Sequence, residues 1–158
     1  MKPTVYVETS IVSAMVDRRD DPMTQAQRTF TVDWWENRRS NFDLFISDAV
    51  IVELNRSAFP HQDEALALLR EMALVTVTPE IMRIVQEYQR HLLMPQGSMG
   101  DATHLAVASV NSMDYLLTWN CRHLANPNKA RHIETINKKL GLHTPIILTP
   151  EMLWDSEV

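Results

Sequence analysis

The segment of residues 100–120 has the sequence GDATHLAVASVNSMDYLLTWN. Its first half, from Asp101 to Val110, is rich in alanine and predicts a helix that begins at an acid. Its second half, from Asp114 to Thr118, is a short apolar run typical of a buried strand, and Asn120 follows that strand. A helix that leads into a buried strand is the unit from which parallel sheets with crossover helices are built.

The same alternation extends through the rest of the chain. Further strands are predicted at Thr4–Val7, Leu44–Ile46, Leu74–Val77 and Ile146–Leu148. Predicted helices lie between them, at residues 10–16, 23–39, 48–58, 63–72, 79–93 and 126–140, and a hydroxyl of Thr9 or Ser10 is expected to cap the first of these. The fold class is therefore α/β, with a mostly parallel sheet and helices on both of its faces.

Composition bounds the class of protein. The chain has 158 residues, 45% hydrophobic and 22% charged, which suits one soluble domain over residues 1–158, and its three glycines mark no linker. The lone cysteine, Cys121, favours a reducing compartment. No signal peptide and no apolar run of 18 residues is present, so the sequence predicts no membrane span and a cytoplasmic location.

The net charge of −5 argues at first against a nucleic-acid partner, since such proteins are usually basic. Its distribution argues the other way. Residues 121–143 carry a net charge of +4, with Arg122, Lys129, Arg131, Lys138 and Lys139 against Glu134. This basic segment begins directly after Asn120 and is interpreted as a contact for the phosphate backbone, although a solvated helix face would have the same pattern.

Polar residues follow the predicted strands in a way that suggests a site. Glu8 ends the first strand, Glu53 lies one turn into the helix after the second, and Asp101 and Asn120 flank the fourth. Ligands of open parallel sheets bind at the carboxyl ends of the strands, so these side chains are expected to converge. Carboxylates that converge repel one another unless a hard cation such as Mg²⁺ or Mn²⁺ lies between them. No Cys/His spacing typical of zinc is present.

Each of these residues also has a purely structural explanation. Glu8 can cap the helix that follows it, and Asp101 can form a capping box with Ser98. Glu53 can pair with Arg56 at i,i+3, and asparagine is a common turn residue. His104, three residues after Asp101, can contact a phosphate or be an interior histidine with satisfied hydrogen bonds.

The chain resembles the PIN domains in three motif regions, which have the sequences VYVETSIVSAM (residues 5–15), SDAVIVEL (residues 47–54) and GDATHLAVASVNSMDYLLTWN (residues 100–120). Among PIN domains it is most similar to the VapC-like toxins of type II toxin–antitoxin systems. The resemblance implies a PIN-like three-layer sandwich with a parallel sheet of four or five strands. It also implies a Mg²⁺- or Mn²⁺-dependent endoribonuclease that acts on RNA, forms a homodimer and binds a cognate antitoxin.

Carried over by position, the resemblance implies four catalytic residues, Glu8, Glu53, Asp101 and Asn120, of which the first three would be metal ligands. Substrate contacts are expected from Thr9, Ser10, Thr118, Arg122, His123, Lys129 and Arg131. Two positions depart from the family's pattern, because Glu8 is longer than the usual Asp and Asn120 is neutral. The neutral residue favours an alternative, a catalytically weakened PIN-like module that binds RNA or protein. A third hypothesis for the function is a phosphatase or DNA nuclease built on a similar sheet.

Overall fold

Five short strands form one parallel sheet in the order β3-β2-β1-β4-β5. The computed structural model describes residues 1–56 and 61–153, and its strands are β1 (Thr4–Val7), β2 (Asp43–Ser47), β3 (Ala73–Val75), β4 (Tyr115–Leu117) and β5 (Ile146–Leu148). The chain builds outward from β1 to β3, then crosses back to place β4 on the other side of β1. This reversal puts a topological switch point between β1 and β4, the place where open sheets of this kind bind ligands.

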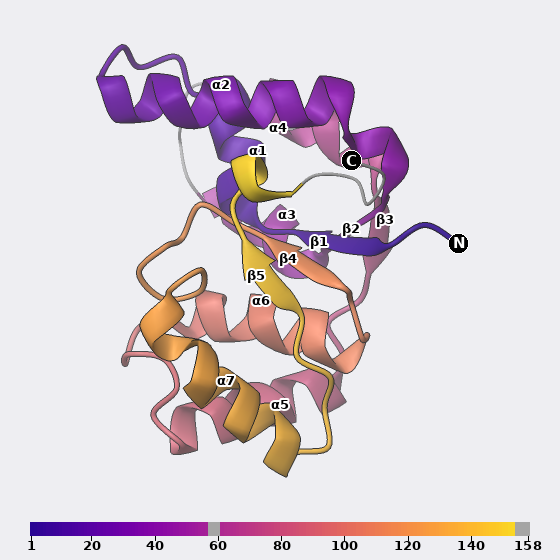
Figure 1. Cartoon of the computed structure of the whole chain (residues 1–158), viewed down its shortest axis with the longest axis vertical. Coiled ribbons are helices and arrows are strands. Elements are labelled where there is room, and N and C mark those ends of the chain that lie inside the picture. Colours follow the sequence, from indigo (N-terminus) through magenta and orange to yellow (C-terminus); the bar gives the residue numbers. More distant parts are fainter. Residues whose placement is uncertain (57–60, 154–158) are drawn as a thin grey trace.

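Helices cover both faces of the sheet, as the sequence predicted. Figure 1 shows α1, α2 and α4 on one side and α5, α6 and α7 on the other. The helices are α1 (Thr9–Val16), α2 (Pro22–Asn37), α3 (Asp48–Arg56), α4 (Gln62–Leu68), α5 (Pro79–Arg90), α6 (Met99–Val110) and α7 (Pro127–Lys139). Single 3₁₀ turns are η1 (Arg39–Asn41), η2 (Leu69–Glu71) and η3 (Pro150–Met152). Within the described ranges, no helix has the length and apolarity that a membrane crossing requires.

Two predicted helix caps are wrong. The cap of α1 is the carboxylate of Glu8, which accepts the backbone N–H of Ser10. The expected hydroxyl cap is therefore wrong, and the structural explanation of Glu8 as a capping acid is confirmed. Ser98 precedes α6, but its side chain makes no capping hydrogen bond because its backbone is not in the extended conformation that such a cap needs (φ −98°, ψ 41°). The proposed capping box between Ser98 and Asp101 is therefore absent, and Asp101 is not explained by it.

Two helix ends also differ from the prediction. Helix α5 stops at Arg90 instead of residue 93, because Leu92 adopts a left-handed backbone conformation with φ 54°. The helix predicted at 63–72 ends earlier, at Leu68, and continues as the tighter turn η2. The predicted end of α3 near Pro60 lies outside the described residues.

The centre of the molecule is formed by β1 and α6. Val5, Tyr6 and Val7 are fully buried, as expected for a middle strand covered on both faces. Every residue of α6 from Ala102 to Ser109 is buried, so this helix is a core element with almost no solvated face. Side chains at the start of α6 are therefore held in fixed positions next to the end of β1.

Candidate metal and catalytic site

Glu8 lies at the carboxyl end of β1, where neighbouring hydroxyls hold its carboxylate. Its backbone N–H donates to the carbonyl oxygen of Leu117 at 3.1 Å, which extends the β1–β4 pairing by one residue. Its Oε1 accepts hydrogen bonds from the hydroxyls of Ser10 and Thr118, each at 2.5 Å. The side chain is thus buried, and two neighbouring hydroxyls fix the position of its carboxylate.

Asn120 and Asp101 are joined across the loop that follows β4. The amide nitrogen of Asn120 donates to Oδ1 of Asp101 at 2.9 Å. The amide oxygen of Asn120 accepts the backbone N–H of His123 at 3.0 Å, which closes the loop. Both ends of this amide are therefore engaged within the protein, and its immediate effect is to fix the carboxylate of Asp101.

A buried chain of hydrogen bonds holds Glu53 in place. Oε1 of Glu53, on α3, lies 2.5 Å from Nε2 of His104, on α6. Nδ1 of the same histidine lies 2.6 Å from the Tyr6 hydroxyl, which in turn is 2.7 Å from Oγ of Ser47. These hydrogen bonds link α3 to α6, α6 to β1, and β1 to β2. The position of the Glu53 carboxylate is therefore set by contacts between four elements of the fold.

Burial and charge shift the pKa values of this group of side chains. Burial raises the pKa of Asp101, and the nearby charge of Glu8 raises it further. Burial alone would lower the pKa of His104, but its hydrogen bond to Glu53 and the charges of Glu8, Glu53 and Asp101 raise it above the ordinary value. Burial opposes the charged form of Glu53, yet the same hydrogen bond and the charge of His104 bring the pKa of Glu53 below its ordinary value. The acids of the site thus favour the protonated, positively charged form of His104.

Glu8, Glu53 and His104 fit a divalent cation. One ligand atom from each lies within 4.8 Å of the others. The two carboxylates suit either Mg²⁺ or Mn²⁺. The imidazole would become a ligand only when its Nε2 is deprotonated and no longer bonded to Glu53, and such a nitrogen suits Mn²⁺ better than Mg²⁺. Asp101 is adjacent, as its electrostatic interaction with Glu8 indicates. The sequence predicted Asp101 as the third ligand, whereas the structure brings His104 into that cluster.

The predicted substrate residues occupy two positions. Thr9 and Ser10 line, together with Glu8 and Glu53, a cavity of about 340 Å³ beside the acids. Thr118 is fully buried beneath Glu8 and acts as a hydrogen-bond relay, since its hydroxyl also accepts the backbone N–H of Asn120 at 2.9 Å. These hydroxyls hold the carboxylate as well as shape the pocket.

The predicted basic residues follow the loop after β4 into α7. His123 and Lys129 interact electrostatically with Asp101, and partial burial lowers the pKa of Lys129 below its ordinary value. Arg122 and Arg131 are exposed to solvent. The basic segment therefore begins at the acids and continues along the outer surface of α7.

Sequence reasoning missed the supporting network. It placed His104 on the same helical face as Asp101 but did not assign it to the site. Tyr6 and Ser47 gave no signal, because a tyrosine inside a strand and a serine before a helix are common. The one available indication was that His104 is a titratable residue in a helix of mostly alanine, leucine and valine.

Comparison with known proteins identifies the family. The family model for the PIN domain matches residues 5–129, and the chain belongs to the PIN domain family. A search of curated protein sequences finds no significant match. The resemblance to PIN domains drawn from three sequence motifs is thus confirmed.

Two solved structures share the fold. VapC20 of Mycobacterium tuberculosis, described as a toxin that cleaves the sarcin–ricin loop, aligns with a TM-score of 0.59 at 21% identity, over 75% of this chain and 92% of its own. VapBC2 of Rickettsia felis, described as bound to a DNA fragment from its promoter, aligns with a TM-score of 0.58 at 15% identity, over 96% of this chain and 99% of its own. Both confirm the PIN-like α/β fold of VapC structures.

Proposed function

We propose that the chain is a divalent-metal-dependent endoribonuclease that hydrolyses RNA phosphodiester bonds. One observation carries the proposal. Glu8 and Glu53, which are 45 residues apart in the sequence, converge with His104 at the switch point of a PIN-domain sheet, and a basic segment begins beside them. Nucleases of this kind need a negatively charged metal pocket next to a surface that attracts phosphate, and these residues supply both.

Glu8, Glu53 and His104 would hold the cation, with Asp101 adjacent. A bound Mg²⁺ or Mn²⁺ supplies two things to hydrolysis, because it activates a water molecule as nucleophile and stabilises the charge that develops on the phosphate. Asp101 is suited to accept a proton from the attacking water, since burial and the charge of Glu8 raise its pKa above the ordinary value. Asn120 orients that carboxylate through the 2.9 Å hydrogen bond.

The substrate would lie over the loop after β4. Arg122, His123, Lys129 and Arg131 would contact phosphates on either side of the scissile bond. Such contacts hold the strand in register without reading its sequence. Thr9 and Ser10 line the cavity that contains Glu8 and Glu53, and they would border the reacting phosphate.

A test of this proposal is cleavage of a defined RNA in Mn²⁺ by the wild-type chain and by Asp101→Asn. The variant keeps the size and the Asn120 contact of the side chain but loses its charge, so we expect loss of cleavage with folding retained. Full activity in Asp101→Asn would contradict the proposal. Single-stranded DNA and a phosphomonoester, assayed in parallel, separate a ribonuclease from a DNA nuclease or a phosphatase.

A second candidate is a catalytically weakened PIN-like module that binds RNA or protein. It is favoured by Asn120, whose neutral amide is engaged by Asp101 and by His123. Calorimetric titration with Mn²⁺ distinguishes the two candidates. A weakened module would bind no specific ion, whereas the nuclease would bind at least one.

We also propose a toxin role, with a cognate antitoxin as partner, and a homodimeric, cytoplasmic protein. The VapC-like fold and the two toxin structures that share it support the partner. A small protein that is co-expressed with the chain, binds it and suppresses its nuclease activity is the expected finding.

A further inference from the structure

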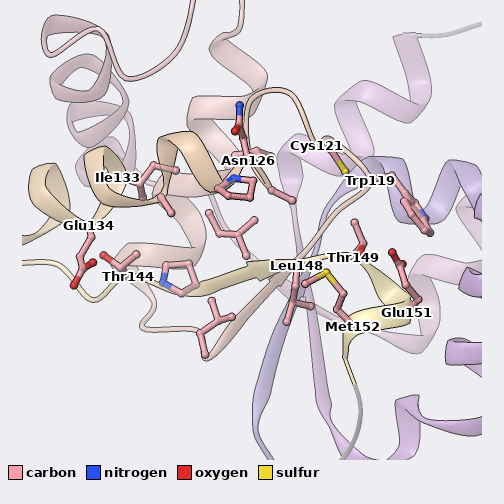
Figure 2. Close-up of a pocket in the computed structure, with 17 residues that line it drawn as sticks. Trp119, Cys121, Asn126, Ile133, Glu134, Thr144, Leu148, Thr149, Glu151 and Met152 are labelled. Carbon is pink, nitrogen blue, oxygen red and sulfur yellow. The ribbon is translucent and has the colours of Figure 1, made fainter.

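A second cavity lies along β5, at one edge of the sheet. It is a groove of about 600 Å³ that follows β5 between α7 and η3, and mostly apolar residues line it. Figure 2 shows Glu134 and Thr144 at one end of the groove, Glu151 and Met152 at the other, and Leu148 between them. Its volume and apolar character are those of a ligand site.

The edge of the sheet is open to pairing along this groove. Strand β5 is the last in the sheet order, so it has a partner strand on one side only. The N–H of Ile146 donates to Asp114 and the carbonyl of Leu148 accepts from Thr118, each at 3.0 Å. Residues of a parallel strand direct their backbone groups to alternate sides, so those of Ile147 point away from β4. They offer a donor and an acceptor to an added strand.

A buried hydroxyl in the groove lacks a partner. Oγ1 of Thr149 is shielded from solvent, and the described part of the chain provides no hydrogen bond to it. The residue is 5% exposed and lines the groove (Figure 2). Buried hydroxyls are normally satisfied, and no described residue satisfies this one, so it can bond a polar group that is bound in the groove.

Charge restricts the chemistry of the occupant. The charged residues that line the groove are Glu134 and Glu151, one near each end, and neither Lys nor Arg is among the described residues that line it. Ala130, Ile133 and Glu134 form the face of α7 that borders the groove, while the basic Arg131 and Lys138 are not part of that lining. An anionic occupant such as a nucleotide is disfavoured, and a cationic one is favoured.

We propose that this groove binds an extended peptide segment of a partner protein, with an apolar side chain in the groove and a Lys or Arg next to it. The segment pairs with the outer edge of β5 through Ile147, and one of its polar groups bonds the hydroxyl of Thr149. Its basic side chain lies against Glu134. This mode, a strand added to a sheet edge, takes affinity from backbone hydrogen bonds and specificity from the groove.

The groove and the acidic site share one residue. Trp119 lines this groove and also the cavity that contains Glu8 and Glu53. Its indole N–H donates to the hydroxyl of Thr31 at 2.7 Å. A peptide in the groove would lie beside Trp119, so the indole signal of Trp119 reports occupancy.

The test begins with a displayed library of random heptapeptides, selected on the full chain. We expect enriched sequences to combine aliphatic or aromatic residues with Lys or Arg. Synthetic versions are then titrated into ¹⁵N-labelled protein, and we expect shifts at the amides of Ile147 and Thr149 and at the indole of Trp119. Binding constants come from calorimetry.

A matched pair of variants on α7 decides the location. Ala130→Arg places a cation in the groove, and Thr135→Arg places the same charge on α7 outside the groove lining; both positions are exposed. We expect Ala130→Arg to weaken peptide binding about tenfold or more and Thr135→Arg to change it less than about twofold. Circular dichroism confirms that both variants fold.

The proposal would be overturned by no enrichment of any peptide, by enrichment of acidic peptides, or by equal effects of the two variants. A small apolar amine that fills the groove and shifts the Trp119 signal, while every selected peptide fails to do so, would also overturn it. That result would assign the groove to a small molecule.

Discussion

Glu53 Oε1 and His104 Nε2 lie 2.5 Å apart, and this contact joins the candidate metal site to the core of the protein. The histidine is 1% exposed, and its other nitrogen continues the network to Tyr6. A carboxylate on the short helix α3 is thereby fixed by a side chain of the most buried helix. The position of this carboxylate thus depends on packing between layers as well as on its own helix.

The first prediction concerns this contact. His104→Ala removes two buried hydrogen bonds, one to the Tyr6 hydroxyl and one to the Glu53 carboxylate. We expect the free energy of unfolding to fall by about 2–4 kcal/mol, as measured by urea denaturation without metal.

The control is His132→Ala, at an exposed position of α7, which should change the free energy of unfolding by less than about 0.5 kcal/mol. Equal, small effects of the two variants would show that the buried network contributes little to stability.

The second prediction concerns the neutral fourth residue. Asn120→Asp replaces the 2.9 Å hydrogen bond to Asp101 by repulsion between two carboxylates, and it adds a negative charge near Glu8. Without metal we expect the variant to be less stable by about 1–3 kcal/mol. With Mn²⁺ we expect affinity to rise about tenfold, because the added charge favours the cation. Denaturation and calorimetric titration measure the two effects.

A matched control exists on α2, where the amide of Asn37 donates to Asp33 at the same distance of 2.9 Å, but in an exposed position. Asn37→Asp should leave Mn²⁺ affinity unchanged. If Asn120→Asp also leaves Mn²⁺ affinity unchanged, position 120 lies outside the reach of the metal.

The fold could be predicted from the sequence because its strands are buried on both faces. A fully buried strand such as Val5–Val7 has to be a short apolar run, so it stands out between polar segments. The ends of helices could not be predicted as well, since they depend on backbone conformations such as that of Leu92, which tertiary contacts impose. The backbone conformation of Ser98 could not be predicted either, and it prevents the side chain from capping α6 as the sequence suggested.

The candidate site could be predicted in part for a related reason. Parallel topology alone directs Glu8 and the residues after β4 to one edge, so their proximity follows from chain order. The pairing of His104 with Glu53 does not follow, because it depends on how α3 packs against α6. The amide orientation of Asn120 depends likewise on the loop that His123 closes.

The third prediction tests the basic segment. Arg122→Ala and Arg131→Ala should each weaken RNA binding, measured by fluorescence anisotropy in EDTA so that no cleavage occurs. If each arginine contacts one phosphate, each substitution should reduce the slope of log affinity against log salt by about 0.7 on single-stranded RNA. The control is Arg70→Ala, an exposed position in η2 outside the basic segment, which should leave the slope unchanged. An unchanged salt dependence of RNA binding in all three variants would show that the basic segment is a solvated helix face that does not contact RNA.

The last prediction concerns pH and the packing of α5 against α7. The Tyr88 hydroxyl donates to Oδ1 of Asn137 at 2.5 Å, and burial raises the pKa of Tyr88 from 10.0 to about 12. The folded state therefore holds this proton more tightly than the unfolded state. Its stabilisation is fully present below pH 10 and is lost as the pH rises from 10 to about 12, by about 3 kcal/mol in total. Tyr88→Phe has no such proton, so the stability difference between wild type and variant should shrink over that interval in urea denaturation. A difference that stays constant with pH would contradict the raised pKa.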